Sequence, residues 1–283
     1  MQRMKVALCQ VNPRLSDVKA NLAMHLANIE EAKHAGADLI VFPELGLTGY
    51  WLKDSTLDVA RTIDHPDICE LIQASCDVDI VFSFVEETKD HRFYTSSVYA
   101  SARRVVHVHR KVYLPTYGLF EEGRHFARGN DVQAFQTNDV SMGMMICEDA
   151  WHPSVPYLLS LSGVDLMIIP SAGPGRALSG DPNSGSQQFW ERVVRTYAQL
   201  FTCYVVFVNR TGFEDGVFFF GHSLVAGPQG DILGGIETHE PGMVIVDLDL
   251  SRLRKERFRT PLLRDENPYL TQRILARRLG DVK

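Results

Sequence analysis

The order of apolar segments along the chain predicts an α/β protein. Short apolar runs of strand length alternate with segments whose apolar residues recur at helical spacing, and this order occurs in each half of the chain. The chain has 283 residues, of which 45% are hydrophobic and 23% are charged. This composition is ordinary for a globular protein with a sizeable core, so it excludes the disordered, collagen-like and membrane classes.

The first half is expected to open as a β-α-β unit. Residues 4–11 form an apolar run of strand length, and Ser16-Asp17 offers an N-cap for a helix that ends near Gly36. Residues 38–42 form a second apolar strand that stops abruptly at Pro43-Glu44. The remaining elements expected in this half are a helix at 67–74 and strands at 79–84, 96–100 and 105–109.

The second half is expected to repeat this order. Its expected elements are strands at 140–146, 166–170 and 204–209, helices at 153–161 and 187–200, and hairpin-like segments as far as Asp249. The loop 171–186 is rich in Gly, Pro and Ser, and its length is typical of a lid or a binding loop. Because no linker-like tract interrupts the chain, we expect a single domain over 1–283. Its basic segment from about 251 to 283, which ends in a helix at 269–278, is a candidate oligomerisation arm.

Charge and cysteine content indicate a small-molecule partner and a reducing compartment. The net charge is −6, which gives no basic surface for nucleic acid or anionic lipid. No apolar run approaches the roughly 18 residues of a membrane-spanning helix, and the N-terminal residues lack the pattern of a signal peptide. The five cysteines form an odd, scattered set, so we expect a cytoplasmic protein without a disulfide framework.

Cys147 is a candidate nucleophile at a corner between a strand and a helix. The apolar strand 140–146 ends at it, and Pro153 marks the start of the next helix. Backbone N–H groups at such a corner are expected to lower the pKa of the thiol and to bind a developing oxyanion. The alternative is a structural cysteine at a strand end, which is the commoner role of a lone Cys.

Glu44 and Lys111 also follow predicted strands. A carboxylate among apolar residues, as Glu44 is, can serve as a general base and acid, and the ammonium of Lys111 can stabilise an oxyanion. Parallel strands end at one edge of a sheet, which is where α/β proteins build their sites. Taken singly, Glu44 is more typical of a capping or solvated glutamate, and Lys111 is more typical of a surface lysine.

Three motifs resemble those of the nitrilase superfamily of carbon–nitrogen hydrolases. They are Phe42-Pro43-Glu44, the run from His109 to Pro115, and Ile146-Cys147-Glu148-Asp149, and their order and positions agree with that family. The resemblance extends from Val6 to Val244. It implies a four-layer αββα sandwich with two sheets, and an assembly of paired subunits that forms a homodimer or a larger homo-oligomer.

The resemblance also implies roles for individual residues. Cys147 corresponds to the nucleophile, Glu44 to the general base and Lys111 to the oxyanion stabiliser. Glu122 corresponds to a second carboxylate that helps to place Lys111 and the substrate, a role that Glu121 matches less well. The implied reaction is hydrolysis of a non-peptide C–N bond of a small amide or carbamoyl compound through a thioester, without a metal or an organic cofactor.

The residues after Cys147 favour amides over nitriles as substrates. Nitrile-cleaving members usually carry Trp-Glu at that position, whereas this chain has Glu148-Asp149. The segments 114–122 and 147–151 are most similar to the glutaminase domain of glutamine-dependent NAD synthetases. Because residues 1–283 contain no phosphate-binding motif, we expect a stand-alone amidase. The alternatives are a glutaminase subunit that supplies ammonia to a partner, an acyltransferase, and a binding scaffold without catalytic activity.

Several residues close to these corners are candidates for substrate binding. Arg176 offers a guanidinium for a substrate carboxylate, with a solvated loop arginine as the alternative. The pair His107 and His109 alternates along one strand but lacks a third ligand at a suitable spacing, so no metal site is expected there. The other candidates for the pocket are Tyr50, Tyr117, Glu148, Trp151 and His152.

Overall fold

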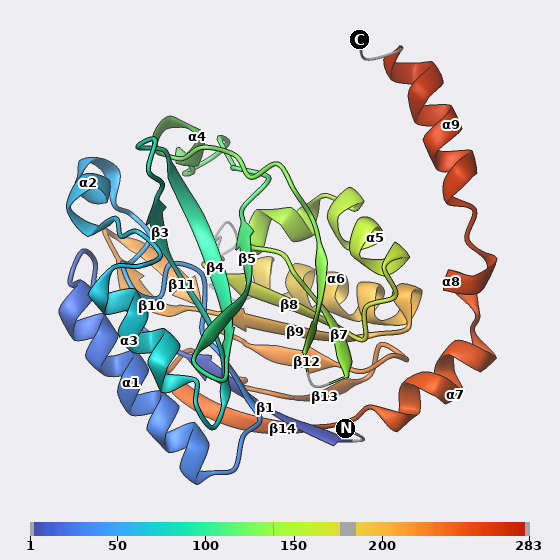
Figure 1. Cartoon of the computed structure of the whole chain (residues 1–283), viewed down its shortest axis with the longest axis horizontal. Coiled ribbons are helices and arrows are strands. Elements are labelled where there is room, and N and C mark those ends of the chain that lie inside the picture. The colour runs from blue at the N-terminus through green and yellow to red at the C-terminus, as the bar shows by residue number, and fades with distance from the viewer. Residues whose placement is uncertain (1–2, 138, 176–184, 281–283) are drawn as a thin grey trace.

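Two sheets lie at the centre of the molecule (Figure 1). The computed structural model describes residues 3–137, 139–175 and 185–280. The first six-stranded sheet contains, in spatial order, β14 (Gly242–Asp249), β1 (Arg3–Gln10), β2 (Leu39–Val41), β3 (Asp79–Glu87), β4 (Phe93–Ser101) and β5 (Arg104–Arg110). The second contains β13 (Ile232–Gly235), β12 (Leu224–Ala226), β9 (Tyr204–Asn209), β8 (Leu166–Ser171), β7 (Val140–Met144) and β6 (Ala134–Thr137). A separate hairpin contains β10 (Thr211–Glu214) and β11 (Val217–Phe220).

The central strands of each sheet are parallel and are connected by helices. Strands β1, β2 and β3 pair in parallel, as do β7, β8 and β9. The connecting helices are α1 (Val18–His34) and α3 (Pro66–Ala74) in the first half, and α5 (Ser154–Leu161) and α6 (Ser186–Phe201) in the second. The repeated order of elements that the sequence predicted is therefore present. It brings the carboxyl ends of the parallel strands to one edge of each sheet.

Helix α1 illustrates how the sequence sets these elements. The Asp17 side chain accepts a hydrogen bond from the backbone N–H of Ala20 at 3.0 Å, which caps the first turn as predicted. Leu22 and Ile29 are buried on one face of the helix, against the first sheet. The helix ends at His34, two residues before Gly36, which has a left-handed φ of 73°.

The alternation of side chains along the strands builds the four layers. In β1, Val6 and Leu8 lie in the core between the two sheets, whereas Ala7 lies in the core beneath α1 and α3. In β8, Ile168 lies between the sheets and Met167 packs on the side of α5 and α6. The chain therefore forms the αββα sandwich that the resemblance implied.

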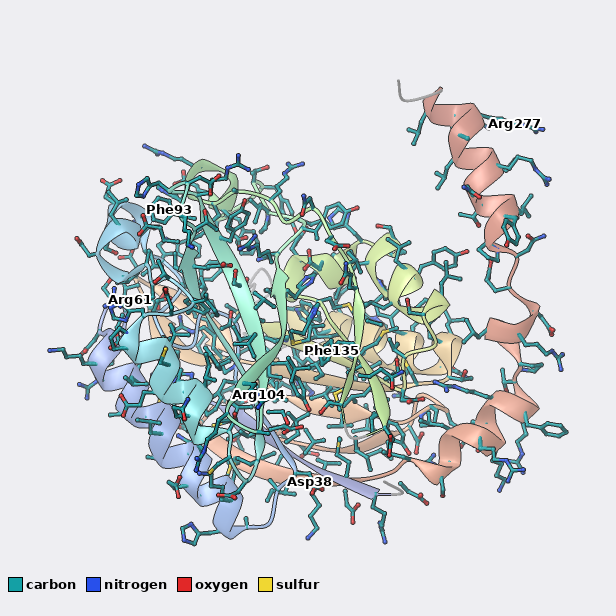
Figure 2. The ribbon with its side chains drawn as sticks, in the orientation of Figure 1. Asp38, Arg61, Phe93, Arg104, Phe135 and Arg277 are labelled. Carbon is teal, nitrogen blue, oxygen red and sulfur yellow. The ribbon has the colours of Figure 1, made fainter. Side chains whose placement is uncertain are left out.

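Short elements at the edges complete the fold. The strand β6 was not expected from the sequence, but its Phe135, labelled in Figure 2, packs in the core between the sheets. It stacks on His107 of β5, so that the edges of the two sheets meet there. The remaining short helices are η1 (Lys53–Ser55), α2 (Thr56–Val59), α4 (Glu122–His125) and η2 (Cys147–Trp151).

The C-terminal segment leaves the sandwich as three helices. They are α7 (Ser251–Arg259), α8 (Leu262–Asp265) and α9 (Pro268–Leu279), and α9 projects away from the sheets in Figure 1. The sequence predicted the last helix but not the other two. No residue of α8 or α9 is buried, and Arg277 extends from α9 with nothing packed around it in Figure 2.

The described residues also bear on the expectations about membrane-spanning segments and disulfide bonds. Within the ranges given above, no helix is both long enough and apolar enough to cross a membrane. All five cysteines are free thiols, with Cys9 and Cys203 buried.

Candidate active site

Three polar side chains from the first half meet in a buried cluster. Glu44 follows β2, Lys111 follows β5 directly, and Glu122 is the first residue of α4. Lys111 Nζ donates to Glu44 Oε1 at 2.6 Å and to Glu122 Oε1 at 2.7 Å. The three side chains are at most 5% exposed. The structure thus brings together the three residues that the sequence assigned to one site.

Cys147 adjoins this cluster from the second sheet, at the corner where β7 gives way to η2. Its φ is 44°, a left-handed value that is uncommon outside glycine and that marks an abrupt turn of the chain. Its thiol interacts with the charges of Glu44 and Lys111 and with the backbone N–H of Ala172. The corner predicted from the sequence is therefore present.

The sequence predicted a lowered pKa for the Cys147 thiol, and this prediction is wrong. Burial raises the pKa of the Cys147 thiol well above its ordinary value, and the neighbouring Glu44 carboxylate raises it further. The ammonium of Lys111 and the backbone N–H of Ala172 lower this pKa, but the effects of burial and of Glu44 are larger. The resting thiol is therefore protonated near neutral pH, and a nucleophile at this position requires a base.

Glu44 is held where a base for Cys147 would be needed. Its Oε1 accepts the hydrogen bond from Lys111, and its Oε2 accepts one from the backbone N–H of Ala172 at 2.9 Å. Ala172 follows β8, so this bond connects the two sheets. Both oxygens of the carboxylate are thus fixed by donors from different segments, which limits its rotation.

Lys111 remains charged in spite of its burial. Burial alone lowers the pKa of this ammonium, but the carboxylates of Glu122 and Glu44 raise it well above its ordinary value. Burial raises the pKa of Glu122 to about 7, against the opposing effect of Lys111. A permanently charged lysine cannot act as the base, but it can stabilise negative charge that develops beside it.

Asp149 organises the corner, although the sequence analysis gave it no role. Its carboxylate accepts hydrogen bonds from His109 Nε2 at 2.8 Å and from the backbone N–H groups of Ile146, Val112 and Tyr113 at 2.9, 3.0 and 2.8 Å. It is fully buried. Asp149 therefore connects the Cys147 corner to the segment after Lys111. His109 contributes one of the hydrogen bonds that hold the Asp149 carboxylate.

A cavity of about 370 Å³ opens beside Cys147. Tyr50, Tyr117, Glu148 and Trp151 line it, as the sequence analysis expected. His152 is not among its lining residues and instead stacks on a neighbouring tyrosine ring at 3.6 Å. The wall also includes Phe120, Phe189 and Trp190. Six aromatic residues therefore contribute to the wall, and Cys147 is among the lining residues.

Glu148 places a carboxylate on this aromatic wall. Its oxygens lie 3.0 and 3.2 Å from the hydroxyl of Tyr117, and His152 Nε2 lies 3.6 Å from Oε1. Burial raises the pKa of Glu148, while Tyr117 lowers it. Arg176, the other predicted contact to a charged substrate group, lies outside the described residues.

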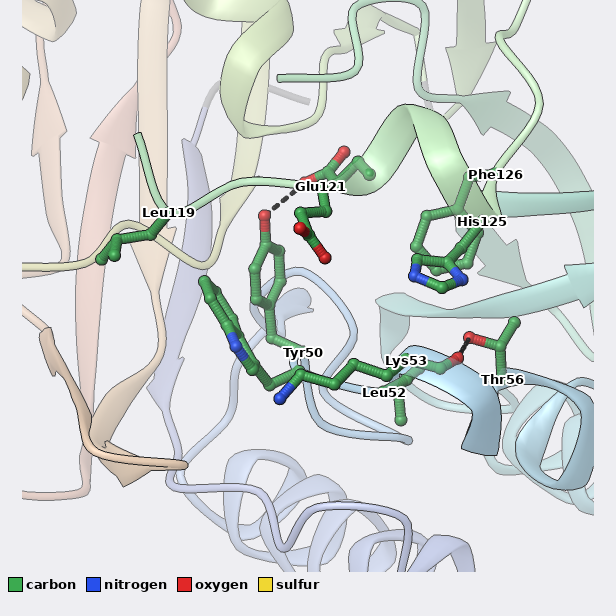
Figure 3. A pocket seen from close by; sticks show the side chains of 10 residues that line it. Tyr50, Leu52, Lys53, Thr56, Leu119, Glu121, His125 and Phe126 are labelled. Atoms are coloured by element: carbon green, nitrogen blue, oxygen red, sulfur yellow. Dashed lines mark hydrogen bonds between the residues drawn. The ribbon is translucent and has the colours of Figure 1, made fainter. Parts of the chain in front are cut away.

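Tyr50 also lines a second cavity of about 300 Å³ (Figure 3). The dashed line that starts at the Tyr50 hydroxyl in Figure 3 is its hydrogen bond to Glu122. Glu121, the less favoured of the two glutamates, is exposed and lines this second cavity, which Lys53 and His125 also line. Glu122 is thus the member of the pair that contacts Lys111.

Potential metal ligands are not gathered elsewhere in the described ranges. Across residues 3–137, 139–175 and 185–280, no three His, Cys, Asp or Glu side chains are arranged to hold a metal ion. His107 stacks on Phe135, and His109 is bonded to Asp149, which accounts for both members of the histidine pair.

The αββα sandwich defines the fold class of the protein, and comparison with known families identifies the family. The family model described as carbon-nitrogen hydrolase matches residues 5–258, so the chain belongs to the carbon–nitrogen hydrolase family. A carbon–nitrogen hydrolase structure from Helicobacter pylori superposes with a TM-score of 0.86 over 96% of this chain and 98% of that chain, at 24% sequence identity. That likeness supports the fold.

The curated relatives include proteins of about twice the length of this chain and proteins of similar length. A glutamine-dependent NAD(+) synthetase from Thermotoga maritima is 29% identical over 275 residues, which is 95% of this chain but 46% of that protein. The chain thus spans about half the length of this relative. A probable nitrilase from Schizosaccharomyces pombe is 28% identical over 96% of this chain and 98% of its own length.

Proposed function

We propose that the protein is a thiol amidohydrolase that cleaves a non-peptide C–N bond of a small amide or carbamoyl compound. The observation that carries this proposal is the position of Lys111, held by Glu44 and Glu122 beside the protonated thiol of Cys147. An acid or base, a cation and a nucleophile in one buried cluster are the groups that acyl transfer requires.

In the first half-reaction Glu44 accepts the proton of the Cys147 thiol, and the sulfur attacks the carbonyl carbon of the substrate. The oxyanion that forms is stabilised by the ammonium of Lys111 and by the backbone N–H of Glu148. When the tetrahedral intermediate collapses, the C–N bond breaks and Glu44 gives its proton to the departing nitrogen. Ammonia or an amine leaves, and the acyl group remains on Cys147 as a thioester.

In the second half-reaction water hydrolyses the thioester. Glu44, now a carboxylate again, accepts a proton from the water molecule, whose oxygen attacks the acyl carbon. The C–S bond breaks, the carboxylic acid leaves, and the sulfur recovers its proton from Glu44. Transfer of the acyl group to an amine instead of water uses the same residues and is distinguished by adding amines to the assay.

The lining of the larger cavity supports a small substrate with an apolar body and a polar end. Tyr50, Tyr117 and Trp151 supply aromatic surface, and Glu148 supplies an acceptor for a donor or cationic group of the substrate. In this proposal Arg176 binds a substrate carboxylate. If Arg176→Ala leaves the ratio of activities on acidic and neutral amides unchanged, that role is wrong.

A glutaminase is the second candidate, favoured by the likeness to the Thermotoga maritima relative. Glutamine carries both an amino group and a carboxylate, so Glu148 and Arg176 would both have partners on it. In this version the ammonia is supplied to a separate protein. The substrate preference of the purified chain decides between a glutaminase and an amidase of other small amides.

We further propose that residues 251–283 form an oligomerisation arm of a homodimer or larger homo-oligomer. Exposed apolar side chains on the described part of this segment support the proposal, because such surface is usually covered in an assembly. They are Phe258, Leu262, Tyr269, Leu270, Ile274, Leu275 and Leu279. Replacing Leu275 by Glu is expected to lower the molar mass found by light scattering. An unchanged mass contradicts the role of the arm.

The free thiols of the five cysteines support a cytoplasmic location for the protein. Fractionation of the native cells tests this proposal. Recovery of the chain with oxidised, disulfide-linked thiols from an exported fraction contradicts it.

The test of the proposed function measures ammonia release from glutamine, N-carbamoyl amino acids, ω-amides, aliphatic amides and nitriles. Wild-type protein is compared with Cys147→Ala and with Cys76→Ala, which removes a partly exposed thiol away from the site. We expect release from at least one amide or carbamoyl compound, abolished only by Cys147→Ala. Release from nitriles alone, or release that survives Cys147→Ala, contradicts the proposal.

A further inference from the structure

A buried ion pair lies behind the Tyr50 wall of the active site. Arg210 Nη1 is 2.5 Å from Glu214 Oε2, and the two side chains are 0% and 3% exposed. The guanidinium also lies over the ring of Phe219, with 4.1 Å between Cζ and the ring centroid. Burial of two charges is costly and contributes little net stability, so such a pair calls for a specific structural use.

The second oxygen of Glu214 holds the backbone that carries Tyr50. Glu214 Oε1 accepts hydrogen bonds from the backbone N–H groups of Tyr50 at 2.9 Å and Trp51 at 2.6 Å. The preceding residue, Gly49, has a φ of 80°, and a Cβ there would lie 2.9 Å from Glu214 Oε2. The close approach of this segment to the carboxylate thus depends on glycine.

Tyr50 in turn contacts the catalytic cluster. Its hydroxyl donates to Glu122 Oε1 at 2.5 Å, and the same oxygen accepts the hydrogen bond from Lys111 at 2.7 Å. Its ring packs edge-on against Phe219, with centroids 5.9 Å apart. A continuous series of contacts therefore leads from Arg210 through Glu214, Tyr50 and Glu122 to Lys111.

We propose that Arg210 and Glu214 are positioning residues that fix Tyr50 and, through Glu122, keep Lys111 beside Cys147. Arg210 orients the carboxylate of Glu214, which anchors the backbone of Tyr50. The shared acceptor Glu122 Oε1 then receives both the hydroxyl and the ammonium in a fixed geometry. The proposal rests on the proposed function for the roles of Lys111 and Cys147. A catalytic group must be held to within about 0.5 Å of its working position by the residues that support it. In this proposal Arg210 and Glu214 provide that support for Lys111.

The experiment measures the rate of Cys147 alkylation by iodoacetamide from pH 6 to pH 10, with the Cys147 peptide quantified by mass spectrometry. No substrate is needed, so the result is independent of the reaction that the protein catalyses. The charged groups that act on the thiol are Glu44, Lys111 and Glu122, and the backbone N–H of Ala172 also acts on it. The thiol in turn acts on the buried Tyr50 hydroxyl. Among these groups Lys111 is the one whose charge favours the thiolate.

Glu214→Gln is the main variant, because it keeps the size of the side chain but removes its charge. Loss of a negative charge alone would favour the thiolate and move the pH profile of alkylation to lower pH. Displacement of Lys111 moves the profile in the opposite direction. We expect a shift to higher pH and a rate near neutral pH that is about threefold to tenfold lower, within the range for sub-ångström misplacement.

A second comparison uses Tyr50→Phe, which removes the hydroxyl that reaches Glu122. If Glu214 acts through Tyr50, adding Glu214→Gln to Tyr50→Phe changes the alkylation profile little. Asp215→Asn is the matched control. Asp215 lies in the same hairpin as Glu214, and its carboxylate forms an exposed ion pair with Lys53 at 2.9 Å. The substitution breaks this pair and is expected to leave the alkylation profile unchanged.

Thermal unfolding separates positioning from a loss of the fold. If Glu214→Gln does not fold, Glu214→Asp takes its place. It retains the charge beside Arg210 but withdraws the carboxylate from the Tyr50 backbone. It is expected to give the same shift of the alkylation profile. An unchanged profile, a shift to lower pH, or an equal effect with and without the Tyr50 hydroxyl overturns the proposal. A shift as expected in a protein that hydrolyses no amide leaves the positioning role intact and overturns only the proposed function.

Discussion

The ammonium of Lys111 lies 2.6 Å from the carboxylate of Glu44, and both side chains are excluded from solvent. In this surrounding the lysine keeps its charge because two carboxylates share it. A buried cation that is held by acceptors needs no reorganisation when negative charge develops beside it, which is the condition for strong stabilisation of a transition state.

Lys111→Met is expected to slow turnover strongly and to destabilise the protein. Loss of one oxyanion donor lowers kcat by roughly 100-fold to 1,000-fold, and removal of one partner from a buried ion pair costs about 3–5 kcal/mol of unfolding free energy. Kinetics on an active amide and denaturant unfolding measure the two effects. Lys53→Met, at an exposed ion pair, is the control. Turnover within tenfold of wild type would show that Lys111 is not the oxyanion donor.

Glu44→Gln is expected to separate the reactivity of Cys147 from turnover. The carboxylate of Glu44 raises the pKa of the thiol, so its removal lowers that pKa and speeds alkylation by iodoacetamide near neutral pH. The same change removes the base and acid of the proposed reaction, so turnover falls by at least about 100-fold. Glu121→Gln, next to Glu122 but exposed, is the control. A parallel fall of alkylation and turnover would contradict this account of Glu44.

Glu122 is expected to make stability depend on pH. Burial raises the pKa of this carboxyl to about 7 from an ordinary value of 4.5. Between these values the folded state binds the proton more tightly than the unfolded state, so the contribution of Glu122 is full below pH 4.5 and is lost as the pH rises through 7. Thermal unfolding of wild type and Glu122→Gln across this range measures the difference. A wild-type advantage that grows with pH would contradict the assignment.

Asp149→Asn is expected to destabilise the Cys147 corner. The amide has one acceptor oxygen in place of two, so it cannot satisfy His109 and the three backbone donors together. An unsatisfied buried donor costs about 1–3 kcal/mol, which denaturant unfolding measures. Glu70→Gln, on the exposed face of α3, is the control. Equal stability of the two variants would show that Asp149 does not hold the corner.

Much of the sandwich and of the central cluster was predictable from the sequence. The parallel strands are apolar runs such as 166–170, and the helices between them begin at clear caps such as Asp17. Glu44 and Cys147 follow strands of this kind, and Lys111 follows β5, which pairs antiparallel with β4. The position of each residue at a strand end is therefore a local property of the sequence. Their roles came from the resemblance, and their distances from the structure.

What the sequence did not predict depends on contacts between distant segments. The strand β6 has four residues and is held by pairing with β7, and Asp149 collects donors from two segments far apart in the chain. Arg210 and Glu214 are spaced like a helical ion pair but lie across the start of a hairpin. The direction of the pKa shift of Cys147 depends on its burial, which a corner motif does not reveal.

The central claim is that Cys147 carries the acyl group of an amide during hydrolysis. The most direct measurement is the mass of the intact protein after acid quenching of a reaction with an active amide, followed by location of the modified residue. We expect a mass increase equal to the amide minus ammonia, located on Cys147 and absent from Cys147→Ala. Continued release of ammonia without any such adduct, or from Cys147→Ala, would contradict it.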